Sequence, residues 1–315
     1  MRRGRFAAGA HGSDRSEPIA VVRDIRRRIK SVTNTRKITR AMELVAAAKL
    51  RKAQARIEAM RPFADRMLEL MAGTARASTS VRGLPLLQQR DEIKTVALVP
   101  VAGDRGLSGA FNSQVMRRVL ALERQLRREG KQVKWVPVGR KPAGTLRFRR
   151  YELDGEFSGF ADEPRYADAQ AVAHRLAELY TEEEVDQVTI VYNAFVSPLV
   201  QRVTVFDILP LSEDLLETDQ EERERDTLHG DFIFEPEPEE ILARLLPVYI
   251  ETELYRALLE SAASKHGAQM TAMRNASKNA GELIDSLTLA MNRARQAEIT
   301  QEILEVVAGA DALTA

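Results

Sequence analysis

The sequence contains no cysteine, and that absence excludes several kinds of chemistry at once. The chain can form no disulfide, no thiolate metal site and no cysteine nucleophile. Aromatic residues make up only 5% of the chain, which argues against a large pocket lined by aromatic rings. No apolar run approaches the roughly 18 residues that a membrane-spanning helix requires. We therefore expect a soluble chain whose contact with any membrane comes through a partner.

Net charge is also nearly absent, because 47 basic residues are balanced by 46 acidic ones. The total charge therefore does not require a polyanionic partner such as nucleic acid. The distribution is uneven, however. Residues 21–61 contain thirteen Lys or Arg and three acids, whereas residues 211–240 contain thirteen acids and two arginines. Such separation along the chain is typical of a protein that presents different faces to different partners.

Proline, the strongest helix breaker, is missing from two long segments. No proline or glycine occurs between Pro18 and Pro62, and no proline follows Pro247. Strong helix formers fill both segments. We predict one helix over residues 20–76 and another over residues 248–308, each about 85–90 Å long at the usual rise per residue.

The C-terminal segment also has the periodicity of a coiled coil. Steps of three and four residues alternate along Met270, Met273, Ser277, Ala280, Ile284, Leu287, Met291 and Ala294. This is the spacing of a coiled-coil seam, and its small residues allow two backbones to approach closely. Two rods of matched length at opposite ends of the chain predict one antiparallel pair, which would form a shaft. The alternative is that two separate amphipathic helices pack on a globular core.

The residues between the rods have the pattern of an α/β domain. Strands are predicted at 95–101, 133–138, 187–192 and 203–209, and helices at about 110–129 and 168–180. Strands that alternate with helices predict a largely parallel, Rossmann-like sheet. The expected fold class is therefore α/β plus a long antiparallel coiled coil, in which the N- and C-terminal helices pair.

Three features of the central segment could suggest enzyme chemistry. The turn from Gly103 to Gly109 lies between a strand and a helix, where phosphate-binding loops occur, but its GxxGxxG spacing matches neither the Walker loop nor the dinucleotide fingerprint. The four histidines include no pair at metal-ligand spacing. Ser108 and Ser113, near Asp104, lie in no nucleophile-elbow motif. We expect a ligand-free turn, with no catalytic residue, no metal and no cofactor.

Several distinct short motifs occur at both ends of the chain and in its centre. They are residues 25–29 (IRRRI), 34–42 (NTRKITRAM), 45–50 (VAAAKL), 104–107 (DRGL), 109–112 (GAFN), 191–193 (VYN) and 294–303 (ARQAEITQEI), with Glu305, Gly309 and Ala310. These motifs closely resemble the gamma subunit of F-type ATP synthases. The C-terminal spacing Ile-Thr-x-Glu-x-x-Glu-x-x-x-Gly-Ala is specific to that family. The resemblance covers about residues 23–313, in the family's order.

The resemblance implies a division of the chain into four parts. Residues 1–20 would be a flexible N-terminal extension without a counterpart in the family. Residues 21–78 and 239–315 would be the two shaft helices, and residues 79–238 the central α/β foot domain. The cysteine-bearing regulatory insert of chloroplast members is absent from the sequence, which excludes thiol switching.

The resemblance also implies a central-stalk rotor subunit without catalytic residues of its own. The shaft would turn inside a ring of alpha and beta subunits, and the foot would sit on the c ring and the epsilon subunit, with one copy per complex. Proton-driven rotation of the c ring would then drive ATP synthesis on the beta subunits. The chain would be peripheral, at the cytoplasmic face of the bacterial plasma membrane, with membrane contact only through the c ring and no nucleic-acid partner.

Three surfaces follow from the matched positions. Arg295 and Gln296 match family positions that contact beta-subunit loops, and Met42 matches another position near that contact. The basic N-terminal helix would face acidic loops of the beta subunits. The C-terminal tip is apolar, and we expect it to turn inside a hydrophobic collar of the ring. Its residues are Ile303, Val306, Val307 and Ala310.

Two other interpretations predict different behaviour. A structural coiled-coil protein would bind acidic partners or nucleic acid through its basic N-terminal helix, with a salt-dependent affinity. That interpretation does not explain the pattern at residues 299–310. A phosphate-handling enzyme built on the Gly103 turn would bind nucleotide as an isolated chain.

Overall fold

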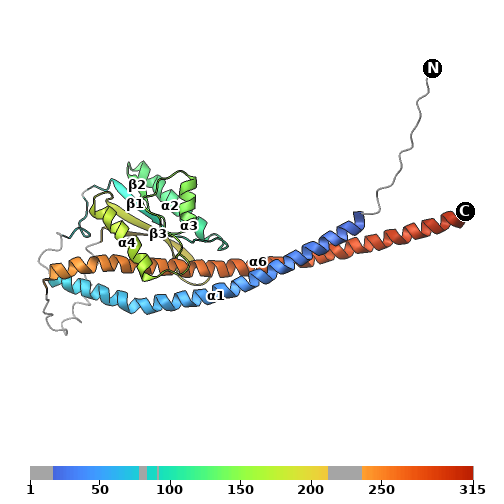
Figure 1. Ribbon diagram of the computed structural model, residues 1–315, viewed down its shortest axis with the longest axis horizontal. Helices are drawn as coiled ribbons and strands as arrows, with labels where there is room; N and C mark the ends of the chain where they lie inside the picture. The colour runs from blue at the N-terminus through green and yellow to red at the C-terminus, as the bar shows by residue number, and fades with distance from the viewer. Residues whose placement is uncertain (1–16, 78–83, 91, 212–235, 315) are drawn as a thin grey trace, which may run out of the picture. The chain divides into compact units, whose positions relative to one another are not determined.

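Two long helices make up the ends of the described chain (Figure 1). The computed structural model describes residues 17–77, 84–90, 92–211 and 236–314. Helix α1 runs from Glu17 to Ala77, and helix α6 runs from Pro238 to Thr314.

Both helices extend beyond their predicted ends. α1 begins at Glu17, inside the segment expected to be an extension, and α6 begins ten residues before the predicted start at Val248. Pro62 and Pro247 lie inside the helices without ending them. An interior proline costs about 3 kcal/mol, but Leu246, next to Pro247, is fully buried in the main core. Burial of the surrounding apolar side chains offsets the missing hydrogen bond.

The chain divides into two compact units. The smaller unit contains residues 17–42 of α1 and 273–314 of α6, and the larger contains residues 43–272. In the smaller unit Thr39 Oγ1 lies 2.7 Å from Ser277 Oγ, and the Arg36 guanidinium lies against Gly281. Partners on α6 rise in number as those on α1 fall, so the two helices are antiparallel. The predicted pairing of the terminal helices is confirmed.

The facing seams of the smaller unit both alternate between steps of three and four residues. On α1 the buried or half-buried side chains include Val22, Ile25, Ile29, Val32 and Thr39. On α6 Met273 and Ala280 are buried, and Ser277, Ile284, Leu287, Met291 and Ala294 are half-buried. The apolar pairs stabilise the helix pair, and the Thr39–Ser277 hydrogen bond satisfies a polar pair within the seam.

The larger unit contains a four-stranded sheet in the order β2-β1-β3-β4. The strands are β1 (Thr95–Pro100), β2 (Gln132–Trp135), β3 (Gln187–Phe195) and β4 (Gln201–Leu209). β1 is parallel to both β2 and β3, as predicted, whereas β4 is antiparallel to β3. The last connection is a short hairpin, which cannot make the crossover that a parallel pair needs.

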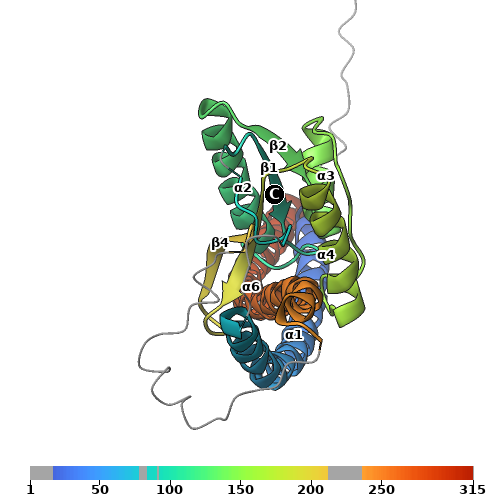
Figure 2. The ribbon, with the colours of Figure 1, turned by 90° about the vertical axis from the view of Figure 1, so that its left-hand side faces the viewer.

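Helices cover both faces of this sheet (Figure 2). They are α2 (Phe111–Arg128), α3 (Arg140–Phe148) and α4 (Tyr166–Thr181). Side chains alternate along β1, so Val96 and Leu98 pack with α2 and α3, while Ala97 and Val99 pack with α4 and α6. The second of these cores also contains Met67 and Met71 of α1. The sheet, α4, α1 and α6 therefore share one core within the larger unit.

Candidate functional site

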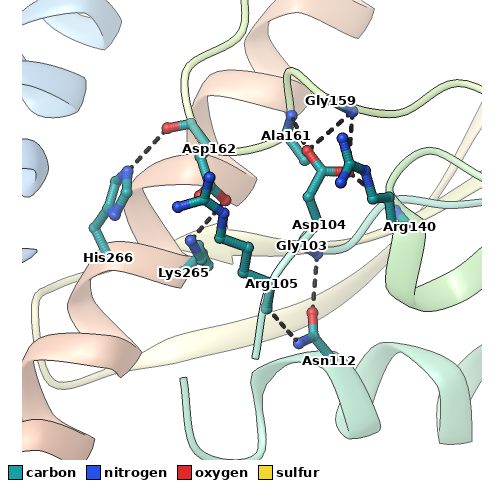
Figure 3. A network of polar contacts seen from close by, with 10 residues as sticks. All are labelled: Gly103, Asp104, Arg105, Asn112, Arg140, Gly159, Ala161, Asp162, Lys265 and His266. Carbon is teal, nitrogen blue, oxygen red and sulfur yellow. Dashed lines mark hydrogen bonds and ion pairs between the residues drawn. The ribbon is translucent and has the colours of Figure 1, made fainter. Parts of the chain in front are cut away.

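The DRGL motif lies in the turn between β1 and α2, and hydrogen bonds to the Asn112 side chain hold its backbone in place (Figure 3). The Gly103 N–H donates to Asn112 Oδ1 at 2.9 Å, and Asn112 Nδ2 donates to the Arg105 carbonyl at 3.3 Å. A Cβ at Gly103 would lie 3.2 Å from both acceptor atoms. Glycine is required here because the turn and the asparagine side chain approach so closely.

The Asp104 side chain joins this turn to two other segments. Its carboxylate accepts the backbone N–H of Arg140 at 3.0 Å, of Gly159 at 3.0 Å and of Ala161 at 3.1 Å. The Arg140 N–H is one of the unpaired donors at the start of α3. A phosphate bound at this turn would need such donors, and the chain's own carboxylate already uses them. The motif therefore has a structural role, which is to hold residues 159–161 in place.

The segment held by Asp104 contacts α6. We call residues 159–165 the clasp loop. Lys265 Nζ donates to Asp162 Oδ1 at 2.6 Å, and only 4% of the lysine side chain is exposed. His266 Nε2 lies 2.9 Å from the Asp162 carbonyl oxygen. Burial lowers the pKa of His266, so its neutral form donates this hydrogen bond from Nε2.

The clasp loop also contacts α1. The Glu163 carboxylate accepts a hydrogen bond from Lys52 and lies 3.6 Å from Arg56 Nη2. Arg56 Nη1 donates to the Pro164 carbonyl at 3.5 Å. The hydrogen bond from Lys52 holds the pKa of Glu163 below its usual value, so this carboxylate stays ionised at neutral pH. The clasp loop therefore contacts both α1 and α6 within the larger unit.

A second attachment joins α4 to α6. Glu251 is buried, and its carboxylate accepts the Tyr166 hydroxyl at 2.7 Å and Gln170 Nε2 at 3.3 Å. His174 Nε2 lies 3.2 Å from the same carboxylate. The three partners are four residues apart, so they form one stripe along α4. This stripe aligns α4 with α6.

A third attachment is a close approach between α6 and the β3–β4 hairpin. A Cβ at Gly267 would lie 3.0 Å from the Pro198 carbonyl oxygen and 3.3 Å from Gln201 Nε2. Glycine in the middle of a helix costs about 0.5–1 kcal/mol relative to alanine. Gly267 therefore allows α6 and the β3–β4 hairpin to lie closer together than any residue with a side chain would.

These three attachments are mechanical in kind. The charged groups of the first two are paired with one another and with backbone groups. Across the described ranges, no group of three His, Asp or Glu side chains is placed to hold a metal ion. Within the same part of the chain, no helix is long and apolar enough to cross a bilayer.

The residues singled out by resemblance lie in α1 and α6. Met42 is half-buried, and Arg295 and Gln296 are exposed. Met270, at the start of the predicted seam, is half-buried and packs near Leu50 and Ala53 of the larger unit. The tip residues are all exposed, and they are Ile303, Val306, Val307 and Ala310. Most of the acidic segment, residues 212–235, lies outside the described residues.

The clasp residues were not identified from the sequence. Asp162, Glu163, Lys265 and His266 are ordinary charged residues in their local context, and no periodicity sets them apart. The DRGL motif was the only signal. Its position was recognised, but its role depends on backbone N–H groups more than thirty residues away.

Comparison with known proteins identifies the family. The family model described as ATP synthase matches residues 21–313. The ATP synthase gamma chain of Rubrobacter xylanophilus is 47% identical over 298 residues, which cover 94% of this chain and all of the relative. The chain belongs to the ATP synthase gamma chain family.

Chains in solved structures of mitochondrial ATP synthases share the fold. A chain in the central stalk/c-ring structure of the Tetrahymena thermophila mitochondrial ATP synthase is 27% identical, with a TM-score of 0.54, over 76% of this chain and 99% of that one. A chain of the Euglena gracilis mitochondrial enzyme has a TM-score of 0.64 over 93% of this chain and 95% of that one. Its identity is 17%, so this second match supports the fold alone.

Proposed function

We propose that this gamma chain is the rotor of the central stalk, which couples proton-driven rotation of a c ring to ATP synthesis on beta subunits. The observation that supports this role most directly is the clasp loop. It contacts α1 and α6 in the larger unit, and its backbone N–H groups donate to the Asp104 carboxylate. A force applied to the α/β domain would therefore reach both helices through bonded contacts.

The energies of these contacts suit the transmission of force. Separating a buried charge pair by removing one partner costs about 3–5 kcal/mol, and Lys265 with Asp162 forms such a pair. Exposed ion pairs contribute only about 0–1 kcal/mol. The inner contact with α6 would resist slippage, whereas weak exposed contacts elsewhere on the helices would be made and broken during rotation.

The proposed partners are the alpha, beta and epsilon subunits and the c ring, with one gamma chain per complex. The Tetrahymena match supports this assignment, because that structure is of a central stalk and a c ring. The chain itself would be non-catalytic and peripheral, at the cytoplasmic face of a bacterial plasma membrane. The exposed tip supports the collar proposal, since Ile303, Val306 and Val307 are each more than half exposed and a solvated helix end rarely carries such a patch.

Reconstitution tests this proposal. The chain is mixed with purified alpha and beta subunits of a bacterial ATP synthase, and the complex is isolated by size. We expect a stoichiometric complex that hydrolyses ATP, and a marked loss of assembly in the tip variant Val306→Asp/Val307→Asp. A chain that stays separate from the alpha and beta subunits would contradict the rotor proposal. Salt-dependent binding of DNA by the same chain would support the coiled-coil alternative instead.

Rotor contacts are tested separately with a single charge. Met42→Lys should favour one angular position of the shaft and slow ATP hydrolysis, while assembly changes little. Leu44→Lys is the matched control, because Leu44 is 60% exposed and lies on the same helix. Equal turnover by both variants and the parent chain would argue against a role for Met42.

A further inference from the structure

A third charged region lies in the folded α/β domain, on α2, α3 and the residues between them. Residues 111–150 contain twelve Lys or Arg and only two acids, Glu123 and Glu129. Some of these cations are paired, such as Arg127 with Glu123 and Arg147 with Glu156. Seven exposed arginines have no ion-pair partner among the described residues, and we call them the basic face. They are Arg117, Arg118, Arg124, Arg128, Arg140, Arg149 and Arg150.

One apolar side chain projects from this region. Phe148, the last residue of α3, is 89% exposed, whereas Leu146, two residues earlier, is fully buried in the core. Residues 111–150 are all described, and among their large apolar side chains only Phe148 is exposed. Tyr151 donates to Glu123 at 3.3 Å, so the end of α3 is tied to the C-terminal half of α2.

The backbone at this point also takes an unfavourable conformation. Arg150 has a φ of +64°, in the left-handed region where glycine usually follows a helix. A residue with a side chain adopts this conformation at an energetic cost. Arg150 therefore occupies a position that would favour glycine, two residues after Phe148.

We propose that the basic face and Phe148 bind the surface of an anionic phospholipid bilayer, with the phenyl ring inserted between headgroups. Arginines are attracted to the negative surface potential of an anionic membrane, and an aromatic side chain among cations is typical of interfacial anchors. Such a contact would be direct, in addition to any contact through the c ring. The inference rests on the proposed function only in placing the chain beside a membrane.

A protein partner fits these observations less well. The centre of a protein–protein interface is depleted of charge and usually contains several apolar residues. Here a single exposed phenylalanine stands between Arg147 and Arg149, and basic residues greatly outnumber acidic ones over residues 111–150. A lipid surface accepts this arrangement because it offers many phosphate groups and a soft apolar layer at any position.

The lack of cysteine allows a site-specific test with the full chain. A single cysteine at Phe148→Cys can be labelled with an environment-sensitive nitrobenzoxadiazole dye. We expect a blue shift and brighter emission when vesicles of phosphatidylglycerol and phosphatidylcholine are added, and no change with phosphatidylcholine alone. The same dye at Phe63→Cys is the control, since Phe63 is 52% exposed but lies on α1.

Sedimentation with the same vesicles measures the contribution of the charges. Arg149→Gln/Arg150→Gln should weaken binding by roughly tenfold or more, and Phe148→Ala by a similar factor. The matched control is Arg26→Gln/Arg28→Gln, which removes two exposed arginines from α1. Equal losses in both double variants would reduce the effect to general charge attraction and overturn the proposal.

Two further outcomes are decisive. A dye at position 148 that responds to a short RNA or to an acidic peptide, and not to anionic vesicles, would overturn the lipid proposal in favour of that partner. If Phe148→Ala and Arg149→Gln/Arg150→Gln lose vesicle binding but still assemble and hydrolyse ATP normally in the reconstituted complex, the lipid proposal is supported. Failure to assemble with alpha and beta subunits would refute the rotor role alone, because vesicle binding is measured on the isolated chain.

Discussion

Lys265 in α6 and Asp162 in the clasp loop form a buried ion pair, with Nζ and Oδ1 separated by 2.6 Å. Asp162→Asn should lower the free energy of unfolding by about 3 kcal/mol, because the lysine charge would remain in a site that excludes water. Lys265→Met should cost less, since it removes the charge and keeps the apolar stem. Urea unfolding of both variants and of the double variant measures the difference. An Asp162→Asn loss no larger than that of Lys265→Met would contradict the buried-pair account.

Acid should weaken the larger unit through His266. Burial lowers the pKa of this imidazole in the folded chain, and its Nδ1 has no hydrogen-bond partner among the described residues. The unfolded chain therefore binds the proton more readily. Stability is unaffected at a pH well above the unfolded value of about 6.5 and falls as the pH drops below it.

The variant His266→Gln isolates this effect. We expect its urea midpoint to change less between pH 7.5 and pH 5.5 than that of the parent chain. The other histidines are present in both proteins, so their titration cancels in the comparison. Equal pH dependence of the two midpoints would rule out His266 as a cause of acid weakening.

Two glycines in the interior of α6 should respond to alanine in opposite directions. At Gly281 a Cβ would lie 3.6 Å from the Arg36 guanidinium carbon, which is ordinary contact, so Gly281→Ala should stabilise the chain by up to about 1 kcal/mol. At Gly267 the Cβ would lie 3.0 Å from the Pro198 carbonyl oxygen. We expect Gly267→Ala to destabilise by about 1–3 kcal/mol. Thermal melts of the two single variants make the comparison, and a shift of the same sign in both would contradict it.

The attachment between α4 and α6 can be weakened by one hydroxyl. Tyr166→Phe removes the 2.7 Å hydrogen bond to the buried Glu251 carboxylate and should cost about 1–2 kcal/mol. Tyr255 packs edge-on against Tyr166, so Tyr255→Phe removes a hydroxyl from the same aromatic pair and serves as the control. The control should change the free energy of unfolding by less than about 0.5 kcal/mol. Similar losses in both variants would refute a specific role for the Tyr166 hydroxyl.

The fold was largely predictable because its main signals are local. The lack of proline and glycine predicted α1, and the alternating three- and four-residue steps predicted the seam of α6. The local pattern predicted the start of α6 ten residues late, since Pro247 is a break by local rules but is offset by packing, whereas the division implied by the resemblance put it at residue 239. α3 was missed because it has only nine residues and contains Pro142 and Gly144, while its first N–H is satisfied by Asp104, thirty-six residues earlier.

The candidate site was much less predictable, because it depends on contacts between distant residues. Asp162 and Lys265 are 103 residues apart, and Lys52 and Glu163 are 111 apart. Neither pair has a local pattern that distinguishes it from the many other charged residues. The resemblance singled out the DRGL motif and predicted a rotor surface, but the link from Asp104 through the clasp loop to the helices required the three-dimensional arrangement.

The clasp loop also constrains how this chain can vary over evolution. Surface loops usually accept insertions and deletions. In the clasp loop, the backbone N–H groups of Gly159 and Ala161 donate to the Asp104 carboxylate. The side chains of Asp162 and Glu163 bind lysines on α6 and α1. One inserted residue would move the Asp162 and Glu163 side chains away from their lysines, because contacts fix the loop on both sides of the insertion. Its length should therefore be as fixed among functional variants as that of a core strand.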